Sequence, residues 1–131
     1  MTFALDTNAL IHALKGLGKV GRRMEQVHPS DLAVPAIVAY EIEVGTLRSG
    51  NPGRRHRELS RLLSVFAVLP FDGPSAERAA RLRFDLEKRG EAIGPMDTLI
   101  AGTVLAHGAT LITHNTIEFS RIPGLMIEDW Y

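Results

Sequence analysis

The sequence predicts a single α/β domain with a central parallel sheet that helices cover on both faces. Short apolar runs alternate along the chain with segments that have the 3.6-residue period of amphipathic helices. These runs are continuously apolar rather than alternating, which is typical of strands buried on both faces of a parallel sheet. The length of 131 residues suits one domain, and no repeat or linker divides it. We therefore expect one domain that spans residues 1–131.

The first half of the chain predicts two strands, each followed by helical sequence. A strand is expected at 3–5, followed by a helix over 9–14 and a second helix that runs from Val20 up to Pro29. A second strand is expected at 32–34, with a helix over 37–47. Each strand would therefore end where a helix begins.

The second half continues the alternation after a predicted loop at 49–53. Leu59, Leu62, Leu63 and Phe66 predict the apolar stripe of a helix, and a strand follows at 67–69. We expect Ser75 to cap a long helix that ends at Gly90. A helix in whose first turn Pro95 lies should end before Gly108, and two last strands are expected at 111–113 and 125–127.

Composition excludes several classes of protein. The chain has no cysteine, so disulfides and thiolate metal sites are excluded, as suits a reducing cytoplasm. No apolar run approaches the roughly 18 residues of a membrane span, and the N-terminus lacks the basic region of a secretory signal. The net charge of zero permits binding to nucleic acid without indicating it, although the segment 54–61 concentrates arginine. We expect a cytoplasmic protein that makes no membrane contact.

Acidic residues stand where a parallel sheet would bring them together. Asp6 follows the first strand, Glu41 lies early in the helix after the second, and Asp97 lies in the first turn of the helix that Pro95 opens. Asn115 and Glu118 follow the strand at 111–113. Because open parallel sheets bind ligands outside the carboxyl ends of their strands, three or four carboxylates should share one pocket.

Each of these residues also has a purely structural interpretation. Asp6 suits a helix N-cap, and Asp97 gains from the positive end of a helix dipole. Glu41 and Glu43 point in roughly opposite directions on a helix, so both cannot easily be solvated surface residues. Glu118 alone would be an ordinary surface residue. The structural and the functional interpretations therefore differ in whether these carboxylates lie close together in the folded protein.

Converging carboxylates repel one another, and a hard divalent cation resolves that repulsion. Mg²⁺ prefers carboxylate oxygens and often completes its coordination with substrate phosphates. The absence of cysteine and of suitably spaced histidines argues against zinc. The chemistry that follows is metal-assisted hydrolysis of phosphodiester bonds.

Four motifs in order carry a family resemblance. They lie at residues 5–11 around Asp6, 34–45 around Glu41, 93–101 around Asp97, and 110–119, which holds Asn115 and Glu118. With residues 123–125 and 128–130, they make the chain resemble the PIN-domain ribonucleases of the VapC type over nearly its whole length.

The resemblance implies a three-layer α/β/α fold and a Mg²⁺- or Mn²⁺-dependent endoribonuclease that is the toxin of a toxin–antitoxin pair. It implies inhibition by a VapB-like antitoxin that inserts a C-terminal segment near the active site, and it implies toxin homodimers. An RNA substrate is expected, with transfer RNA suggested by analogy. Many relatives carry an aspartate where this chain has Asn115, so Asn115 or Glu118 would complete the site. Pro35 replaces a more usual serine.

The resemblance and the residues together suggest individual roles. Asp6 and Asp97 are the expected principal metal ligands, with Glu41 binding directly or through water. Thr7 and Thr113 are expected to orient these carboxylates, with helix capping as an equal alternative for Thr7.

Basic and histidine side chains give less specific predictions. Candidate contacts to the RNA backbone are the arginines of two segments: Arg54, Arg57 and Arg61, or Arg22 and Arg23. Three histidines, His12, His56 and His114, are expected in surface or loop positions, although His114 belongs to the fourth motif.

Two other functions compete with a nuclease. A phosphatase of the haloacid-dehalogenase type also begins with an aspartate after its first strand, but it needs a second aspartate where this chain has Asn8. A PIN fold that has lost its chemistry and serves only as a binding module is the second alternative. The three main carboxylates argue against that module.

Overall fold

A computed structural model describes all 131 residues and contains a sheet of five parallel strands in the order β3-β2-β1-β4-β5. The strands are β1 (Phe3–Leu5), β2 (Leu32–Pro35), β3 (Ala67–Leu69), β4 (Thr110–Ile112) and β5 (Met126–Glu128). The central strand β1 pairs with β2 on one side and β4 on the other. The parallel sheet that the sequence predicts is therefore confirmed.

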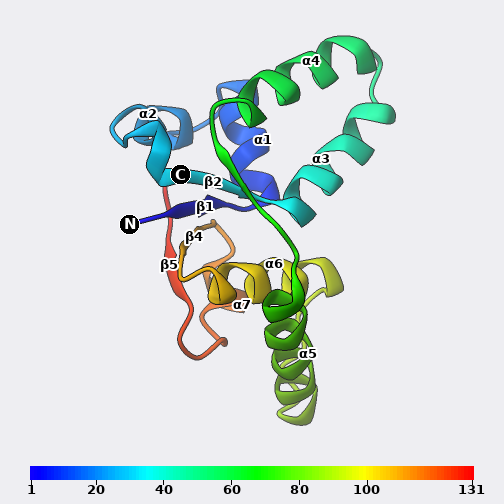
Figure 1. The fold of residues 1–131 in the computed structure, drawn as a ribbon, viewed down its shortest axis with the longest axis vertical. Coiled ribbons are helices and arrows are strands. Elements are labelled where there is room, and N and C mark those ends of the chain that lie inside the picture. Colours follow the sequence, from blue (N-terminus) through cyan, green and yellow to red (C-terminus); the bar gives the residue numbers. More distant parts are fainter.

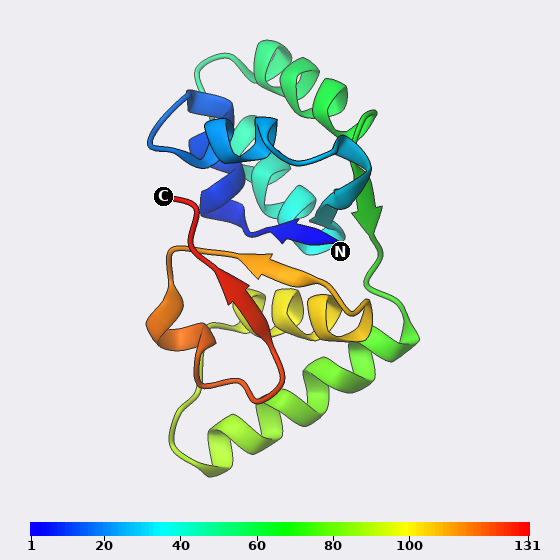
Figure 2. The ribbon, with the colours of Figure 1, turned by 90° about the vertical axis from the view of Figure 1, so that its left-hand side faces the viewer.

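Helices flank the sheet on both sides, as Figures 1 and 2 show. They are α1 (Thr7–Lys15), α2 (Val20–Glu25), α3 (Ala36–Leu47), α4 (Pro52–Leu63), α5 (Gly73–Lys88), α6 (Pro95–Ala106) and the short α7 (Thr116–Phe119), with a 3₁₀ turn at Pro29–Asp31. In these views α1 to α4 lie on one side of the sheet, and α5 and α6 lie on the other. The expected three layers are present, and no helix is both long and apolar enough to cross a membrane.

The three central strands form the middle of the core. Ala4 and Leu5 of β1, Val34 of β2, and Leu111 and Ile112 of β4 are all completely buried. The two edge strands are much more exposed. This distribution explains why continuous apolar runs predict β1, β2 and β4 well, since helices cover both faces of the central strands.

Several element boundaries differ from those predicted from the sequence. The predicted loop at 49–53 ends at Asn51, whose Oδ1 accepts a hydrogen bond from the Arg54 N–H at 3.3 Å and caps α4. Phe66 lies beyond the end of α4, although it packs on the core. Both last strands are displaced by one residue, because the register Thr110↔Met126 decides where they pair. The short helix α7 was not predicted.

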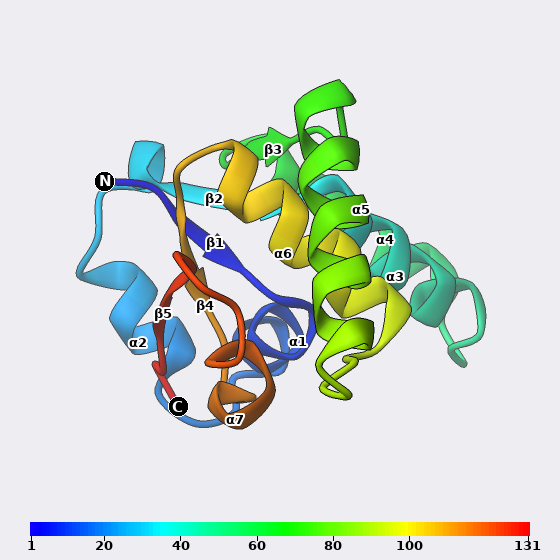
Figure 3. The ribbon, with the colours of Figure 1, turned by 90° about the horizontal axis from the view of Figure 1, so that it is seen from below.

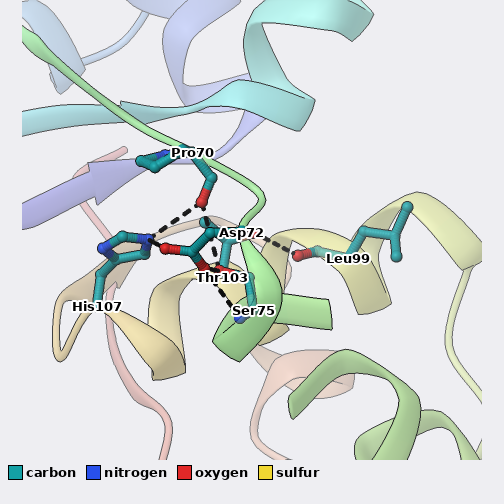
Figure 4. A network of polar contacts seen from close by, with 6 residues as sticks. All are labelled: Pro70, Asp72, Ser75, Leu99, Thr103 and His107. Atoms are coloured by element: carbon teal, nitrogen blue, oxygen red, sulfur yellow. Dashed lines mark hydrogen bonds and ion pairs between the residues drawn. The ribbon is translucent and has the colours of Figure 1, made fainter. Parts of the chain in front are cut away.

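Asp72, not Ser75, caps α5. Its Oδ1 accepts hydrogen bonds from the Ser75 N–H at 3.0 Å and from the Ser75 hydroxyl at 2.7 Å. Asp72 takes the extended backbone of an N-cap, which places Ser75 inside the first turn as the donor. His107, which follows α6, lies with its Nε2 3.1 Å from the Pro70 carbonyl oxygen and 3.6 Å from Asp72 Oδ2 (Figure 4). This network joins the start of α5 to the end of α6.

The helices α5 and α6 lie directly against each other, as the view from below shows (Figure 3). Their closest approach is at Gly102 of α6, where a Cβ atom would lie only 2.6 Å from the Cβ of Ala79. A residue with any side chain at this position would therefore push the two helices apart.

Candidate active site

Asp6 lies at the carboxyl end of β1 and caps α1. Its Oδ1 accepts a hydrogen bond from the Ala9 N–H at 2.8 Å, and its own N–H donates to the Ile112 carbonyl of β4 at 3.1 Å. The residue is only 7% exposed. Capping and a place in the site therefore occur together, because the cap fixes the carboxylate at the edge where the strands end.

Glu41 lies in the second turn of α3 and faces Thr7 of α1. The Thr7 hydroxyl donates a hydrogen bond of 2.6 Å to Glu41 Oε1. Of the two interpretations of Thr7, the structure supports an orienting hydroxyl, since Asp6 takes the capping position. Glu43 points elsewhere and lies 3.1 Å from the Nδ1 of His56 on α4. The two glutamates of α3 thus have separate roles.

Asp97 lies in the first turn of α6 and is partly buried. The pKa of its carboxyl is raised to about 6, chiefly by burial and in addition by repulsion from Glu41, Glu118 and Asp6. The pKa of Asp6 is also raised, chiefly by burial, although hydrogen bonds from Thr113 and the Ala9 N–H oppose the shift. The four carboxylates therefore lie close enough together to repel one another.

Asn115 and Glu118 form one polar unit at the end of β4. The Asn115 Nδ2 donates a hydrogen bond of 3.0 Å to Glu118 Oε2, and the Asn115 N–H donates to the Thr113 hydroxyl at 3.0 Å. The neutral amide thus holds the glutamate on the side of the site where Glu118 repels Asp97. Glu118 therefore supplies the negative charge of this unit, and Asn115 holds Glu118 by its hydrogen bond.

The donor set fits a hard divalent cation. None of the four carboxylates forms an ion pair with a lysine, arginine or histidine, so their negative charge is not neutralised within the protein. No three of the chain's histidine, aspartate and glutamate side chains stand in a ligating arrangement, however. Carboxylates repel one another without a cation, and their side chains would have to rotate to share an ion.

The histidines differ in their surroundings. His56 and His114 are exposed as expected, with 60% and 66% of their side chains accessible, and each pairs with a carboxylate. His12 departs from the expected surface or loop position. It lies within α1 and packs against Tyr131, and its Nδ1 is buried without a hydrogen-bonding partner. The position of Tyr131 had no local sequence signal, because it depends on a contact between the two ends of the chain.

The arginines proposed for RNA contacts are exposed on two helices. Arg54, Arg57 and Arg61 lie on α4, where Arg54 pairs with Glu58 at 3.3 Å, while Arg22 and Arg23 lie on α2. The structure adds Lys15 and Arg55, which line a groove of about 240 Å³ that reaches Glu41. Ile11, Leu14 and Ile42 supply the apolar part of that groove.

Comparison with known proteins gives consistent matches over the whole chain. The PIN domain profile matches residues 3–125. The tRNA(fMet)-specific endonuclease VapC of Salmonella typhimurium is 32% identical over 130 residues, which cover 99% of this chain and 98% of that protein. Ribonuclease VapC2 of Rickettsia felis is 33% identical over 132 residues, with the same coverage of both chains.

Solved structures match equally well. The DNA-bound VapBC complex of Salmonella typhimurium contains a chain that superposes with a TM-score of 0.93 at 32% identity, covering 100% of this chain and 99% of that one. The VapBC2 complex of Rickettsia felis, bound to a promoter fragment, gives a TM-score of 0.92 at 32% identity and covers both chains fully.

Proposed function

Since this chain belongs to the PIN-domain family, we propose that it is the endoribonuclease toxin of a VapBC-type toxin–antitoxin pair. The observation that carries the proposal is the convergence of Asp6, Glu41 and Glu118 on Asp97, whose pKa is raised to about 6 by burial and, in addition, by repulsion from these three carboxylates. A group of unpaired carboxylates at the carboxyl edge of a parallel sheet is suited to a metal-dependent phosphodiesterase. Family membership sets aside the haloacid-dehalogenase alternative.

Mg²⁺ or Mn²⁺ is the proposed cofactor, and its chemistry is polarisation of the scissile phosphate and activation of the attacking water. Asp6 and Asp97 are the proposed principal ligands, with Glu41 binding directly or through water. The hydrogen bond from the Ala9 N–H holds the Asp6 carboxylate in place, and the hydrogen bond from the Thr7 hydroxyl holds that of Glu41. Asn115 holds Glu118 beside them. Without a cation these carboxylates would repel an RNA phosphate, so substrate binding at this point needs the ion.

The principal test replaces Asp97 by asparagine. We expect antitoxin-free wild-type protein with Mn²⁺ to cut cellular RNA into discrete fragments, and Asp97→Asn to lose this cleavage while keeping its fold. Transfer RNA is the first substrate to examine, because one relative is named for cleavage of tRNA(fMet). Sequencing of the fragment ends would locate the bond.

The matched control is Asp85→Asn, which removes an exposed carboxylate from α5 and should cleave like wild type. An EDTA sample tests the cation requirement. Equal cleavage by Asp97→Asn and wild type would contradict the assignment. Metal binding without cleavage of any RNA would favour a binding module instead.

The proposed partner is a VapB-like antitoxin. Supporting this, the matched solved structures are VapBC complexes, and the groove that reaches Glu41 offers apolar side chains of α1 and α3 for an inserted segment. A peptide in that groove would lie beside the carboxylates and would compete with RNA. Addition of the antitoxin should therefore abolish cleavage by wild-type protein.

Homodimerisation is proposed from the resemblance and from the outer face of α3. Tyr40 and Leu47 are 58% and 69% exposed there and lie about two helical turns apart on one side of the helix. Light scattering of Tyr40→Ser with Leu47→Ser, compared with wild type, tests this face. An unchanged dimer in the double variant would place the interface elsewhere.

A further inference from the structure

A shallow hollow beside the carboxylates is lined, apart from Asn115, by residues that the proposed reaction does not use. Its volume of about 470 Å³ is within the range of small-molecule sites. The lining residues are Asn8, His12, His114, Asn115 and Tyr131. Asn8 lies two residues after Asp6, and Asn115 bonds Glu118. The hollow therefore adjoins the point where the phosphate would be cut.

Three aromatic rings form a column at this hollow. The ring of His114 stacks on that of Tyr131 with centroids 4.4 Å apart and an interplanar angle of 21°, and Tyr131 packs on His12 with centroids 4.5 Å apart. His114 ends the column and is 66% exposed. Its Nδ1 lies 2.9 Å from Asp129 Oδ2, which fixes the plane of the imidazole. The outer ring is therefore held in place and accessible to a planar ligand.

The polar groups of the hollow suit a neutral ligand with hydrogen-bonding edges. No lysine or arginine lines it, so it lacks the cations that usually hold a phosphate. Asn8 is exposed and makes no side-chain hydrogen bond within the protein, and an asparagine amide can pair with the edge of a base. His12 Nδ1 and Tyr131 Oη are buried without partners, which is unusual for polar atoms and is typical of functional sites.

From this arrangement we propose that the hollow binds an unpaired nucleobase of the RNA, next to the scissile phosphate, by stacking it on His114. Single-stranded RNA is recognised chiefly through bases that stack on aromatic side chains, including histidine. The proposal rests on the proposed ribonuclease function and adds a specificity-determining surface to it. His114 would orient the substrate and take no part in bond cleavage.

The experiment uses protein with the intact carboxylate site, millimolar Mg²⁺, and single-stranded RNA oligonucleotides with a non-hydrolysable phosphonate linkage at the bond that wild type cuts. These oligonucleotides carry 2-aminopurine at successive positions around that bond. Stacking on an aromatic ring quenches this base. We expect quenching at one position adjacent to that bond. His114→Ala in the same background should abolish the quenching and weaken binding roughly tenfold, a typical loss for one stacked base.

Two further variants separate stacking from other effects of His114. His114→Phe keeps an aromatic face and should retain the quenching. His28→Ala is the matched control. His28 is another exposed histidine, but it precedes β2 and so lies toward the amino ends of the strands, away from the carboxyl ends where the site lies. It should bind RNA like the parent protein.

Three outcomes would overturn the proposal. Unchanged quenching and affinity in His114→Ala, while wild type cleaves RNA, would remove the base subsite and leave the nuclease function intact. If His114→Ala weakened the binding of RNA that is abasic at the quenched position as much as the binding of intact RNA, His114 would contact the phosphate or sugar instead of the base. If wild type neither binds nor cuts RNA, the ribonuclease function fails, and the subsite fails with it.

Discussion

At the scale of the single residue, Asp97 links the chemistry of the site to the stability of the fold. Its pKa is raised from 3.8 to about 6, so the folded state holds this proton more tightly than the unfolded chain does. The fold is therefore favoured by a protonated Asp97 at low pH, and this advantage disappears as the pH rises from about 4 through 6. Above pH 6 the ionised carboxylate opposes folding in full.

Asp97→Asn should accordingly stabilise the protein at neutral pH when divalent cations are removed. The shift of about two pKa units corresponds to roughly 3 kcal/mol at full burial. Asp97 is partly exposed and solvent screens it, so we expect a gain of about 1–2 kcal/mol at pH 7.5 that shrinks at pH 4.5. Urea unfolding in EDTA at the two pH values measures the gain.

Asp85→Asn serves again as the control and should change the free energy of unfolding little at either pH. A gain in Asp97→Asn that does not depend on pH would assign the effect to packing rather than to charge. No gain at pH 7.5 would mean that neither burial nor the other carboxylates disfavour the ionised form of Asp97.

Sequence reasoning places residues well where local rules decide. Asp6, Glu41 and Asp97 each follow a strand end or open a helix, so their convergence could be predicted from the order of elements. The contact of His12 with Tyr131 could not, because it joins two segments from opposite ends of the chain. The hydrogen bond between Asn115 and Glu118 could not be predicted either, because it depends on the unpredicted helix α7.

At the scale of the element, the contact between α5 and α6 depends on one glycine. Gly102→Ala should destabilise the fold, because the added Cβ would lie 2.6 Å from Ala79 Cβ. Overpacking of a well-packed contact typically costs about 1–3 kcal/mol. Thermal unfolding followed by circular dichroism measures the loss.

Gly21→Ala is the matched control for this substitution. Gly21 also lies within a helix, but a Cβ atom added there would meet no other atom within 4 Å. Since alanine favours helices over glycine by about 0.5–1 kcal/mol, Gly21→Ala should be neutral or stabilising. If both variants behaved alike, the close approach of α5 and α6 would not limit the stability of the fold.

The boundaries of helices and strands are less predictable than their types, because boundaries depend on capping and on pairing between strands. Asp72 replaces Ser75 as the cap of α5 because the cap needs an extended backbone, which composition alone does not reveal. The displaced strands follow the register of hydrogen bonds between neighbours. Periodicity reports burial, while boundaries depend on pairing and capping.

At the scale of the whole molecule, the carboxylates come from four separate segments that only the complete fold brings together. The sequence predicts a parallel sheet, but local patterns do not specify the order β3-β2-β1-β4-β5. That order places β1 between β2 and β4, so that the residues after these strands meet at one edge. The pattern of short apolar runs and helical segments already predicts helices on both faces of the sheet, and the family resemblance implies the same three layers.

A divalent cation should therefore stabilise the whole fold, since only the folded chain presents the site. At a free Mn²⁺ concentration ten times the dissociation constant, the expected gain is about 1.4 kcal/mol. For a domain of this size that gain raises the Tm by roughly 5 °C. Thermal scans with and without millimolar Mn²⁺ measure it.

The same scans on Asp97→Asn provide the comparison, because this variant lacks one proposed ligand and should gain much less. An equal rise in Tm for both proteins would place the cation elsewhere on the surface. An unchanged Tm in wild type at millimolar Mn²⁺ would contradict a cation site of useful affinity.

The central strand β1 also pairs with two strands that are made at very different times during translation. Phe3 pairs with Leu32, which the ribosome makes soon after it, and with Thr110, which it makes much later. A growing chain thus carries Asp6 and Glu41 before Glu118 has been made. If the chain has the proposed function, the nascent polypeptide would therefore lack part of the site until β4 and Glu118 have emerged.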